Sequence, residues 1–438
     1  MFDPIMGGPN LISMNGHEWQ QWRSVFNPAF SNSYLLQQLP AVIDSAEVFC
    51  QKLLECARAG SIFPLQDPAA RLTVDIIFKL AMDEDTDYQN KPNVMADALR
   101  SILPWTSISN IFLRFHPVRP FAVWYYNHIM DKYSKKALSV RFEEAKIRFL
   151  NGDDDGRKDK SVISLALRDY LENKSQSREI SHSTSMDPDF ETFMRRQMRL
   201  FLWAGHDTTT SVLVFTYHLL SKTPHALAAI RAEHDKVLGP NLDEAAQKLR
   251  SGPTLLNQLP YTLAAIKETM RMFPPAGAER VGKPGVYLVD RHGTQYPTEG
   301  FHISIQHLGL HHNPRLWPRP REYLPERFIV DPTHELYPKN GAFRPFEHGA
   351  RNCMGQSLAL IELRTVLALT VRKFDIRPAY EEWDMIRPKG WFGKTDSKEN
   401  NSVDGERAYQ VAEKGAAHPA EGYPCRVTCL PRISCPST

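Results

Sequence analysis

The sequence has no run of apolar residues long enough to cross a membrane as a helix. Such a helix needs about 20 predominantly apolar residues with few or no charges, and no stretch of the 438 residues meets this requirement. The sequence also shows no secretory signal. We therefore predict no transmembrane anchor in this chain.

Cysteine is scarce, and the spacing of the six that occur matches neither a disulfide framework nor a zinc site. Common zinc sites use closely paired cysteines or histidines, and the three cysteines nearest the C-terminus lack that pairing. We therefore predict a reducing, cytosol-facing environment without a disulfide framework. The six are Cys50, Cys56, Cys353, Cys425, Cys429 and Cys435.

Neither sign of charge is in large excess. The 53 lysines and arginines against 50 aspartates and glutamates give a net charge of +3, which is too small to indicate a nucleic-acid partner. No internal repeat is found, and no shift in composition marks a domain boundary. We therefore predict a single domain over residues 1–438, with 42% hydrophobic residues available for a large core.

What the sequence does contain is a cysteine between two glycines and an arginine, directly before an apolar helical pattern. Residues 346–355 are Phe-Glu-His-Gly-Ala-Arg-Asn-Cys-Met-Gly. A metal-bound thiolate must be deprotonated and shielded, so backbone N–H donors, positive charge and the dipole of a following helix favour it. Gly349 and Gly355 allow the close turn that brings such donors near. Cys353 is therefore a candidate metal ligand, and the alternative is a buried cysteine in a glycine-rich turn.

This segment resembles the haem-binding loop of the cytochrome P450 superfamily, Phe-x-x-Gly-x-Arg-x-Cys-x-Gly, and every fixed position is filled. The resemblance implies that Cys353 is the axial ligand of the iron of haem b. It also implies that Arg351 meets a haem propionate, and that Phe346, Gly349 and Gly355 complete the cofactor-binding loop.

Upstream, residues 204–209 read Ala-Gly-His-Asp-Thr-Thr within a helical pattern and resemble the family's oxygen-activation motif. Gly205 gives backbone freedom, and the Thr208 hydroxyl can bond a carbonyl one turn back, so we expect both to distort the helix. The resemblance implies that Asp207 and Thr208 are catalytic and deliver protons, while Ala204 and Gly205 lie against the haem. The alternative is an ordinary buried helix with a polar patch.

Glu268 and Arg271 lie three residues apart on one predicted helix, and Arg327 follows in Pro-Glu-Arg-Phe. Such pairs are usually exposed and contribute little. The segments resemble the family's Glu-x-x-Arg and Pro-x-Arg-Phe signatures, which implies a buried structural triad. A carboxylate shared by two guanidinium groups survives burial because its acceptor sites are filled. The implied role is support of the haem loop, without chemistry.

Near the other end, Trp19 and Arg23 resemble the family's third-helix pattern, Trp-x-x-x-Arg, and would both reach a propionate. The alternative is a common amphipathic pairing. Arg280 is a further candidate propionate ligand. Because this pattern occurs so near residue 1, we predict a P450 fold that lacks its usual N-terminal portion. Strands such as Val286–Asp290 would then lose sheet partners and expose an edge.

Helical spacing dominates the chain, and strand signals cluster after Pro275, so we predict a mainly α fold with small β-sheets (α+β). Polar stretches at 151–160, 173–186 and 389–407 are predicted loops. The aromatic segment 111–126 belongs in the core by default, whereas the resemblance implies a peripheral membrane contact there. The predicted helices are 45–59, 68–82, 121–150, 190–222, 223–238, 260–273 and 355–374.

These resemblances imply a haem-thiolate monooxygenase that inserts one oxygen atom from O2 into a small apolar organic substrate. The reaction would be a hydroxylation, an epoxidation or a multistep oxidation. Electrons would come from NADPH through a separate NADPH-cytochrome P450 reductase, because no flavin or nicotinamide domain fits in this length. Sequence details near the C-terminus look similar to fungal microsomal members, including those of secondary metabolism, at the cytosolic face of the endoplasmic reticulum.

Two other functions stay open at this point. The pattern near residue 19 begins so early that the chain could be a truncated, non-catalytic haem-binding protein or an apo protein. A haem-thiolate isomerase or dehydratase would share Cys353 but would need no external electrons and no proton relay. The Asp207–Thr208 pair argues against this second alternative.

Overall fold

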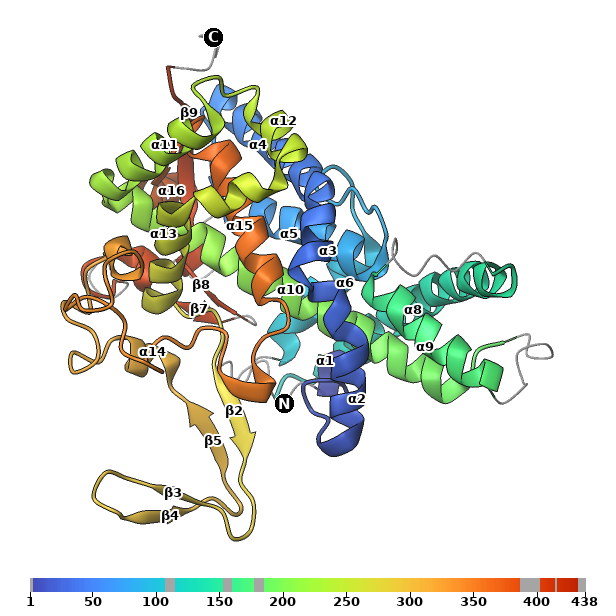
Figure 1. Ribbon diagram of the computed structural model, residues 1–438. Coiled ribbons are helices and arrows are strands. Elements are labelled where there is room, and N and C mark those ends of the chain that lie inside the picture. Colours follow the sequence, from blue (N-terminus) through green and yellow to red (C-terminus); the bar gives the residue numbers. More distant parts are fainter. Residues whose placement is uncertain are drawn as a thin grey trace.

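The computed structural model describes residues 3–106, 115–152, 160–176, 185–386, 402–413 and 416–431. Helices make up most of this part of the chain, and its strands form small antiparallel sheets (Figure 1). The predicted fold class, mainly α with small β-sheets, is confirmed.

Helix α10 (Pro188–Lys222) runs through the centre of the molecule and carries the Ala204–Thr209 segment. It begins where the Asp187 side chain accepts hydrogen bonds from the backbone N–H groups of Asp189 and Phe190. Pro188 follows at the first helical position, where its missing N–H costs nothing. Most residues from Met194 to Leu220 are buried, and the rest are only partly exposed, because α10 packs against α5, α8 and α13.

The helices that surround α10 form one continuous apolar core. Six of them, together with α10, match the predicted helices to within a few residues, except that α4 begins earlier and α15 ends earlier. The matching helices are α4 (Leu39–Ala59), α5 (Gln66–Met82), α8 (Arg119–Leu150), α10, α11 (Pro224–Leu238), α13 (Pro260–Met272) and α15 (Gln356–Thr370). The others are α1 (Asp3–Met6), α2 (Gly16–Phe26), α3 (Asn32–Gln37), α6 (Val94–Thr106), α9 (Val162–Gln176), α12 (Ala245–Ser251), α14 (His307–His311) and α16 (Tyr380–Ile386).

One sheet joins segments from both ends of the chain. Its order is β1-β9-β6, with β1 (Ile62–Pro64) and β6 (Phe374–Pro378) each antiparallel to β9 (Pro424–Cys429). A two-stranded sheet of β7 (Ala412–Glu413) and β8 (Ala417–His418) lies against α10. This position brings the end of the chain beside the central helix.

The remaining strands form an arm that extends from the helical body (Figure 1). We call residues 278–305 the arm; it contains β2 (Ala278–Val281), β3 (Tyr287–Val289), β4 (Gln295–Pro297) and β5 (His302–Ile305). Within the described chain β2 pairs only with β5, and β3 pairs only with β4. The prediction that these strands expose an edge is confirmed.

Some predicted features differ from the structure. The last residues of α9 lie inside the predicted loop 173–186, and most of the predicted loops at 151–160 and 389–407 lies outside the described residues. The default expectation that segment 111–126 packs in the core is wrong for Phe115, Phe121 and Trp124, which are 76%, 64% and 60% exposed. Residues 107–114 lie outside the described part.

The cysteines of the described residues differ in their state. Cys50, Cys56, Cys353 and Cys425 are free thiols. Cys429 takes part in a disulfide, which its spacing in the sequence did not predict.

Candidate active site

The Cys353 loop is closed by a hydrogen bond across its own ends. The backbone N–H of Cys353 donates to the carbonyl of Phe346 at 2.9 Å. Gly349, with φ +77°, starts the short turn Gly349–Arg351 in a backbone region that favours glycine. Helix α15 begins just beyond Gly355, so its N-terminus lies at the cysteine.

The Cys353 sulfur meets the donors that a thiolate needs. Burial among neighbouring chain segments raises the pKa of the Cys353 thiol, although one side of the residue is exposed to solvent. Backbone N–H groups of Gly355 and Gln356 bond to the sulfur, and these bonds and the charge of Arg23 act to lower the same pKa. Burial therefore favours the protonated form of the free thiol. The N–H groups and the charge of Arg23 stabilise the thiolate that forms when a metal displaces the proton.

Helix α2 is tied to this loop across more than three hundred residues of sequence. The Arg23 guanidinium donates to the Asn352 carbonyl and to Asn352 Oδ1, both at 3.0 Å. Arg351 donates in return to the Met14 carbonyl at 2.8 Å, and its guanidinium lies 3.8 Å from the centre of the Trp19 ring. The structure therefore brings Trp19 and Arg23 to the Cys353 loop.

Three arginines from three chain segments converge beside the cysteine. Burial lowers the pKa of Arg351, and the charges of Arg280 and Arg23 lower it further. Their hydrogen bonds run to backbone or amide oxygens, and within the described residues none of the three forms an ion pair with a carboxylate. Clustered guanidinium groups without anionic partners favour an anion at this place.

The half-exposed face of α10 contains Ala204 and Thr208, one turn apart, whereas His206, Asp207 and Thr209 are buried. The Thr208 hydroxyl donates to the Ala204 carbonyl at 2.9 Å, which is the predicted bond one turn back. Even so, α10 remains one continuous helix through this stretch. No hydrogen bond or ion pair of the described chain joins this face to the Cys353 loop, and the two are related through the packing of α10 on α15.

Gly205 faces α5. A Cβ atom at this position would lie 2.5 Å from Cγ1 of Ile77, so the glycine permits the close approach of α5 and α10. The room that Gly205 provides is therefore filled by a side chain of α5, and its predicted contact with a cofactor stays a prediction.

Asp207 points toward the end of the chain. Its carboxylate accepts hydrogen bonds from the backbone N–H of Ala416 and lies 2.8 Å from Nε2 of His418. Sequence reasoning did not connect either residue with Asp207, because they follow it by about two hundred positions; His418 begins the segment 418–425, whose only recognised feature was a likeness to fungal microsomal members.

The structure also brings Glu268, Arg271 and Arg327 together, each with 0% side-chain exposure. Two guanidinium nitrogens of Arg271 donate to the two Glu268 oxygens at 2.8 and 2.9 Å, and Arg327 Nε donates at 3.1 Å. The backbone N–H of Leu324 supplies a fourth bond to the same carboxylate. The acceptor sites of the buried carboxylate are thus filled, as burial of an ion pair requires.

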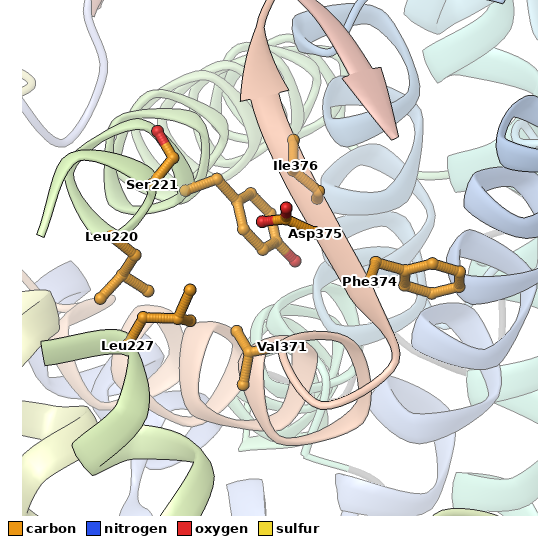
Figure 2. A pocket seen from close by; sticks show the side chains of 8 residues that line it. Leu220, Ser221, Leu227, Val371, Phe374, Asp375 and Ile376 are labelled. Atoms are coloured by element: carbon orange, nitrogen blue, oxygen red, sulfur yellow. The ribbon is translucent and has the colours of Figure 1, made fainter. Parts of the chain in front are cut away.

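A small cavity elsewhere lies between α10, α11 and the start of β6 (Figure 2). It has a volume of about 20 Å³ and is lined by residues such as Leu220, Val371 and Ile376. This volume holds about one water molecule. The cavity is too small for an organic ligand.

The residues around Cys353 fit haem. They provide a single sulfur ligand with N–H donors at a helix N-terminus, together with arginines that lack carboxylate partners within the described residues. A haem needs one axial ligand, and its two propionates need cations.

Comparison with known proteins agrees with this chemistry. Residues 4–398 match the family model "Cytochrome P450". The chain is 39% identical over 430 residues to cytochrome P450 monooxygenase polC of Polytolypa hystricis, covering 98% of this chain and 74% of that protein. It is 32% identical over 445 residues to cytochrome P450 monooxygenase acrF of Aspergillus aculeatus, covering 97% and 85%.

A more distant relative comes from an animal. Cytochrome P450 4A10 of Rattus norvegicus is 28% identical over 377 residues, which cover 85% of this chain and 70% of that protein. No helix in the described part of this chain is long and apolar enough to cross a membrane. On the family match and the two relatives above 30% identity, the chain belongs to the cytochrome P450 family and is a monooxygenase of that family.

Proposed function

We propose that residues 1–438 act as one domain that inserts one oxygen atom from O2 into a small apolar organic substrate. The observation that carries this proposal is the Cys353 sulfur, which receives bonds from the N–H groups of Gly355 and Gln356 beside Arg23, Arg280 and Arg351. A thiolate ligand distinguishes oxygen-activating haem proteins from globin-like oxygen carriers.

The residues of the chain divide the work of holding the cofactor. Cys353 binds the iron, while Arg23, Arg280 and Arg351 neutralise the propionates, with Trp19 packed beneath Arg351. Phe346, Gly349 and Gly355 shape the loop. Bound haem supplies the redox chemistry that activates O2.

Proton delivery falls to Asp207 and Thr208. The Thr208 hydroxyl lies on the half-exposed face of α10 with Ala204, and Asp207 is the adjacent acid. Glu268, Arg271 and Arg327 do no chemistry and hold the segment that leads into the Cys353 loop. Both assignments rest on position and chemistry and follow the predictions from the motifs.

The electrons come from NADPH through a separate NADPH-cytochrome P450 reductase, which docks on the basic surface around Arg23 and Arg351. Two relatives above 30% identity are named monooxygenases and come from the fungi Polytolypa hystricis and Aspergillus aculeatus. We place the reaction in fungal secondary metabolism on this likeness. The proposed source of electrons is tested by measuring whether product formation requires NADPH and a fungal reductase.

The protein contacts the cytosolic face of the endoplasmic reticulum membrane through the start of α8. Phe121, Trp124 and Tyr125 are 64%, 60% and 48% exposed there, and the Phe121 ring stacks on Tyr125 and lies tilted against Trp124. Exposed aromatic side chains suit the interface between lipid and water. Replacing Phe121 and Trp124 by serine should reduce co-sedimentation with phosphatidylcholine vesicles, and unchanged binding would exclude this surface.

The decisive test is the reduced carbon-monoxide difference spectrum of the full chain expressed with a supply of haem. We expect a thiolate-type Soret band that is lost in Cys353→Ala. The matched control is Cys56→Ala, a free thiol at the end of α4, which should keep the band. A band of the same type in Cys353→Ala would show that Cys353 is not the ligand.

The same spectrum, combined with a turnover assay without NADPH, separates the other functions. A chain that folds but shows no thiolate-type band is the apo or non-catalytic protein. A chain that shows the band and converts a substrate without NADPH is an isomerase or dehydratase. Retention of the Asp207–Thr208 pair favours the monooxygenase over that last outcome.

A further inference from the structure

Both carboxylate oxygens of Asp207 contact the segment Ala416–His418, which includes strand β8. Oδ1 lies 2.8 Å from His418 Nε2, and Oδ2 accepts from the backbone N–H of Ala416. The neighbouring Thr208 hydroxyl instead donates to the Ala204 carbonyl. In the described chain the acid of the motif therefore bonds to the β8 segment and forms no hydrogen bond with its partner hydroxyl.

The β8 segment is fixed in place independently of Asp207. The N–H of Ala417 donates to the Pro275 carbonyl at 3.0 Å, and Ser211 Oγ donates to the Ala417 carbonyl. Asp207 and Ser211 are four residues apart, so the segment contacts two successive turns of one face of α10. The backbone next to His418 is thus held by Pro275 and Ser211 as well as by Asp207.

His418 is 1% exposed, and its Nδ1 finds no hydrogen-bond partner within the described residues. A buried polar atom without a partner lowers the stability of the fold. The contact of Nε2 with Asp207 offsets this loss. Burial alone would raise the pKa of Asp207, but the bond and charge of His418, the charge of His206 and the Ala416 N–H lower it to about 2.

We propose that His418 is a positioning residue for Asp207: its Nε2 contact fixes where the Asp207 carboxylate lies relative to the Thr208 hydroxyl. Proton delivery by Asp207 then depends on a histidine more than two hundred residues away in sequence. This inference rests on the proposed function for its catalytic consequence, whereas the coupling between the two side chains is a property of the folded chain alone.

The first test is a double-mutant cycle on the unfolding equilibrium in urea, with Asp207→Asn, His418→Gln and the double variant. Glutamine keeps an N–H donor near the place of Nε2 but lacks the imidazole ring. We expect a coupling of roughly fivefold or more in the unfolding constant. The control cycle pairs Asp207→Asn with His234→Gln, a buried histidine that bonds to Thr262, and should be additive. Additivity in both cycles would overturn the proposal.

The pH dependence of unfolding provides a second measurement that does not depend on haem. Asp207 has a folded-state pKa below its ordinary value of 3.8. Its stabilisation is therefore present above pH 3.8 and is lost as the pH falls toward 2. His418 and His206 act on its charge, and Arg100 of α6 acts on His206. In His418→Ala the folded-state pKa of Asp207 should rise, because the bond and charge of His418 no longer oppose the effect of burial. An unchanged pH profile would contradict the proposal.

The catalytic readout is the ratio of hydrogen peroxide released to product formed at saturating NADPH. We expect a roughly tenfold rise in His418→Ala, partial recovery in His418→Gln, and no change in His234→Gln. If the wild-type chain gives no thiolate-type spectrum, the proposed function fails while the double-mutant cycle still reports on His418. If the wild type turns over and His418→Ala matches the His234→Gln control, the inference fails and the proposed function stands.

Discussion

The helical body and the arm differ in what they bury: the body buries even charged side chains, whereas the arm leaves apolar side chains exposed. In the body, Glu268 and its two arginines are fully buried, and the Glu268 carboxylate accepts four hydrogen bonds. In the arm, Val281, Leu288 and Val289 are 70%, 51% and 62% exposed, and only hairpin ladders hold the strands. Two-stranded ribbons without a hydrophobic face are marginally stable. The difference teaches that stability in this chain comes from burial around α10, and that the arm adds little to it.

The largest effect should follow from Glu268→Ala. The substitution leaves Arg271 and Arg327 buried without a carboxylate, which costs about 3–5 kcal/mol of unfolding free energy. Urea denaturation of the apo chain measures this loss. The arm equivalent, Glu279→Ala on the exposed strand β2, should stay within about 0.5 kcal/mol. Similar losses in the two variants would break the contrast, and Glu268→Gln serves if the alanine variant does not fold.

A pair of glycine substitutions should give an intermediate effect. In the body, Gly205→Ala drives a Cβ to within 2.5 Å of Ile77 Cγ1, and overpacking of this kind costs about 1–3 kcal/mol. The additional change Ile77→Ala removes the clashing atoms and should recover part of the loss. Thermal unfolding of the single and double variants measures both effects.

The matching arm variant is Gly282→Ala. Its Cβ would overlap the backbone carbonyl of Thr298, so the junction between the two hairpins must open. We expect the melting temperature to stay unchanged while trypsin cuts faster at Arg291, since the arm can open without unfolding the body. A fall in melting temperature equal to that of Gly205→Ala would show that the arm folds together with the body.

The smallest effects should come from Val→Thr substitutions on strands. Val427 of β9 is 1% exposed and Val289 of β3 is 62% exposed. A buried hydroxyl without a partner costs about 1–3 kcal/mol, whereas an exposed one costs less than about 0.5 kcal/mol. Val289→Thr should also slow aggregation, which light scattering measures, because it makes an exposed strand more polar. Equal destabilisation by the two variants would mean that β3 is covered in solution.

Long amphipathic helices were predictable, while short or interrupted elements were not. The apolar spacing of α4, α5, α8 and α10 fixed their type, with boundaries off by a few residues. Helix α6 went unpredicted because Pro104 interrupts its last turn. Helix α9 continues through polar residues that sequence reasoning assigned to a loop. The exposed aromatics Phe121 and Trp124 were misjudged because composition does not tell which side of a helix meets solvent.

The sequence by itself determined the Cys353 loop, because the turn, the donors and the following helix all lie within a few residues of the sulfur. Only the tertiary structure decided which distant groups act on the site. Arg23 and Arg280 reach Arg351, and His418 reaches Asp207, because α2, the arm and β8 pack where they do. Electrostatic and hydrogen-bond effects depend on distance and burial, and neither quantity exists for separated segments until the chain has folded.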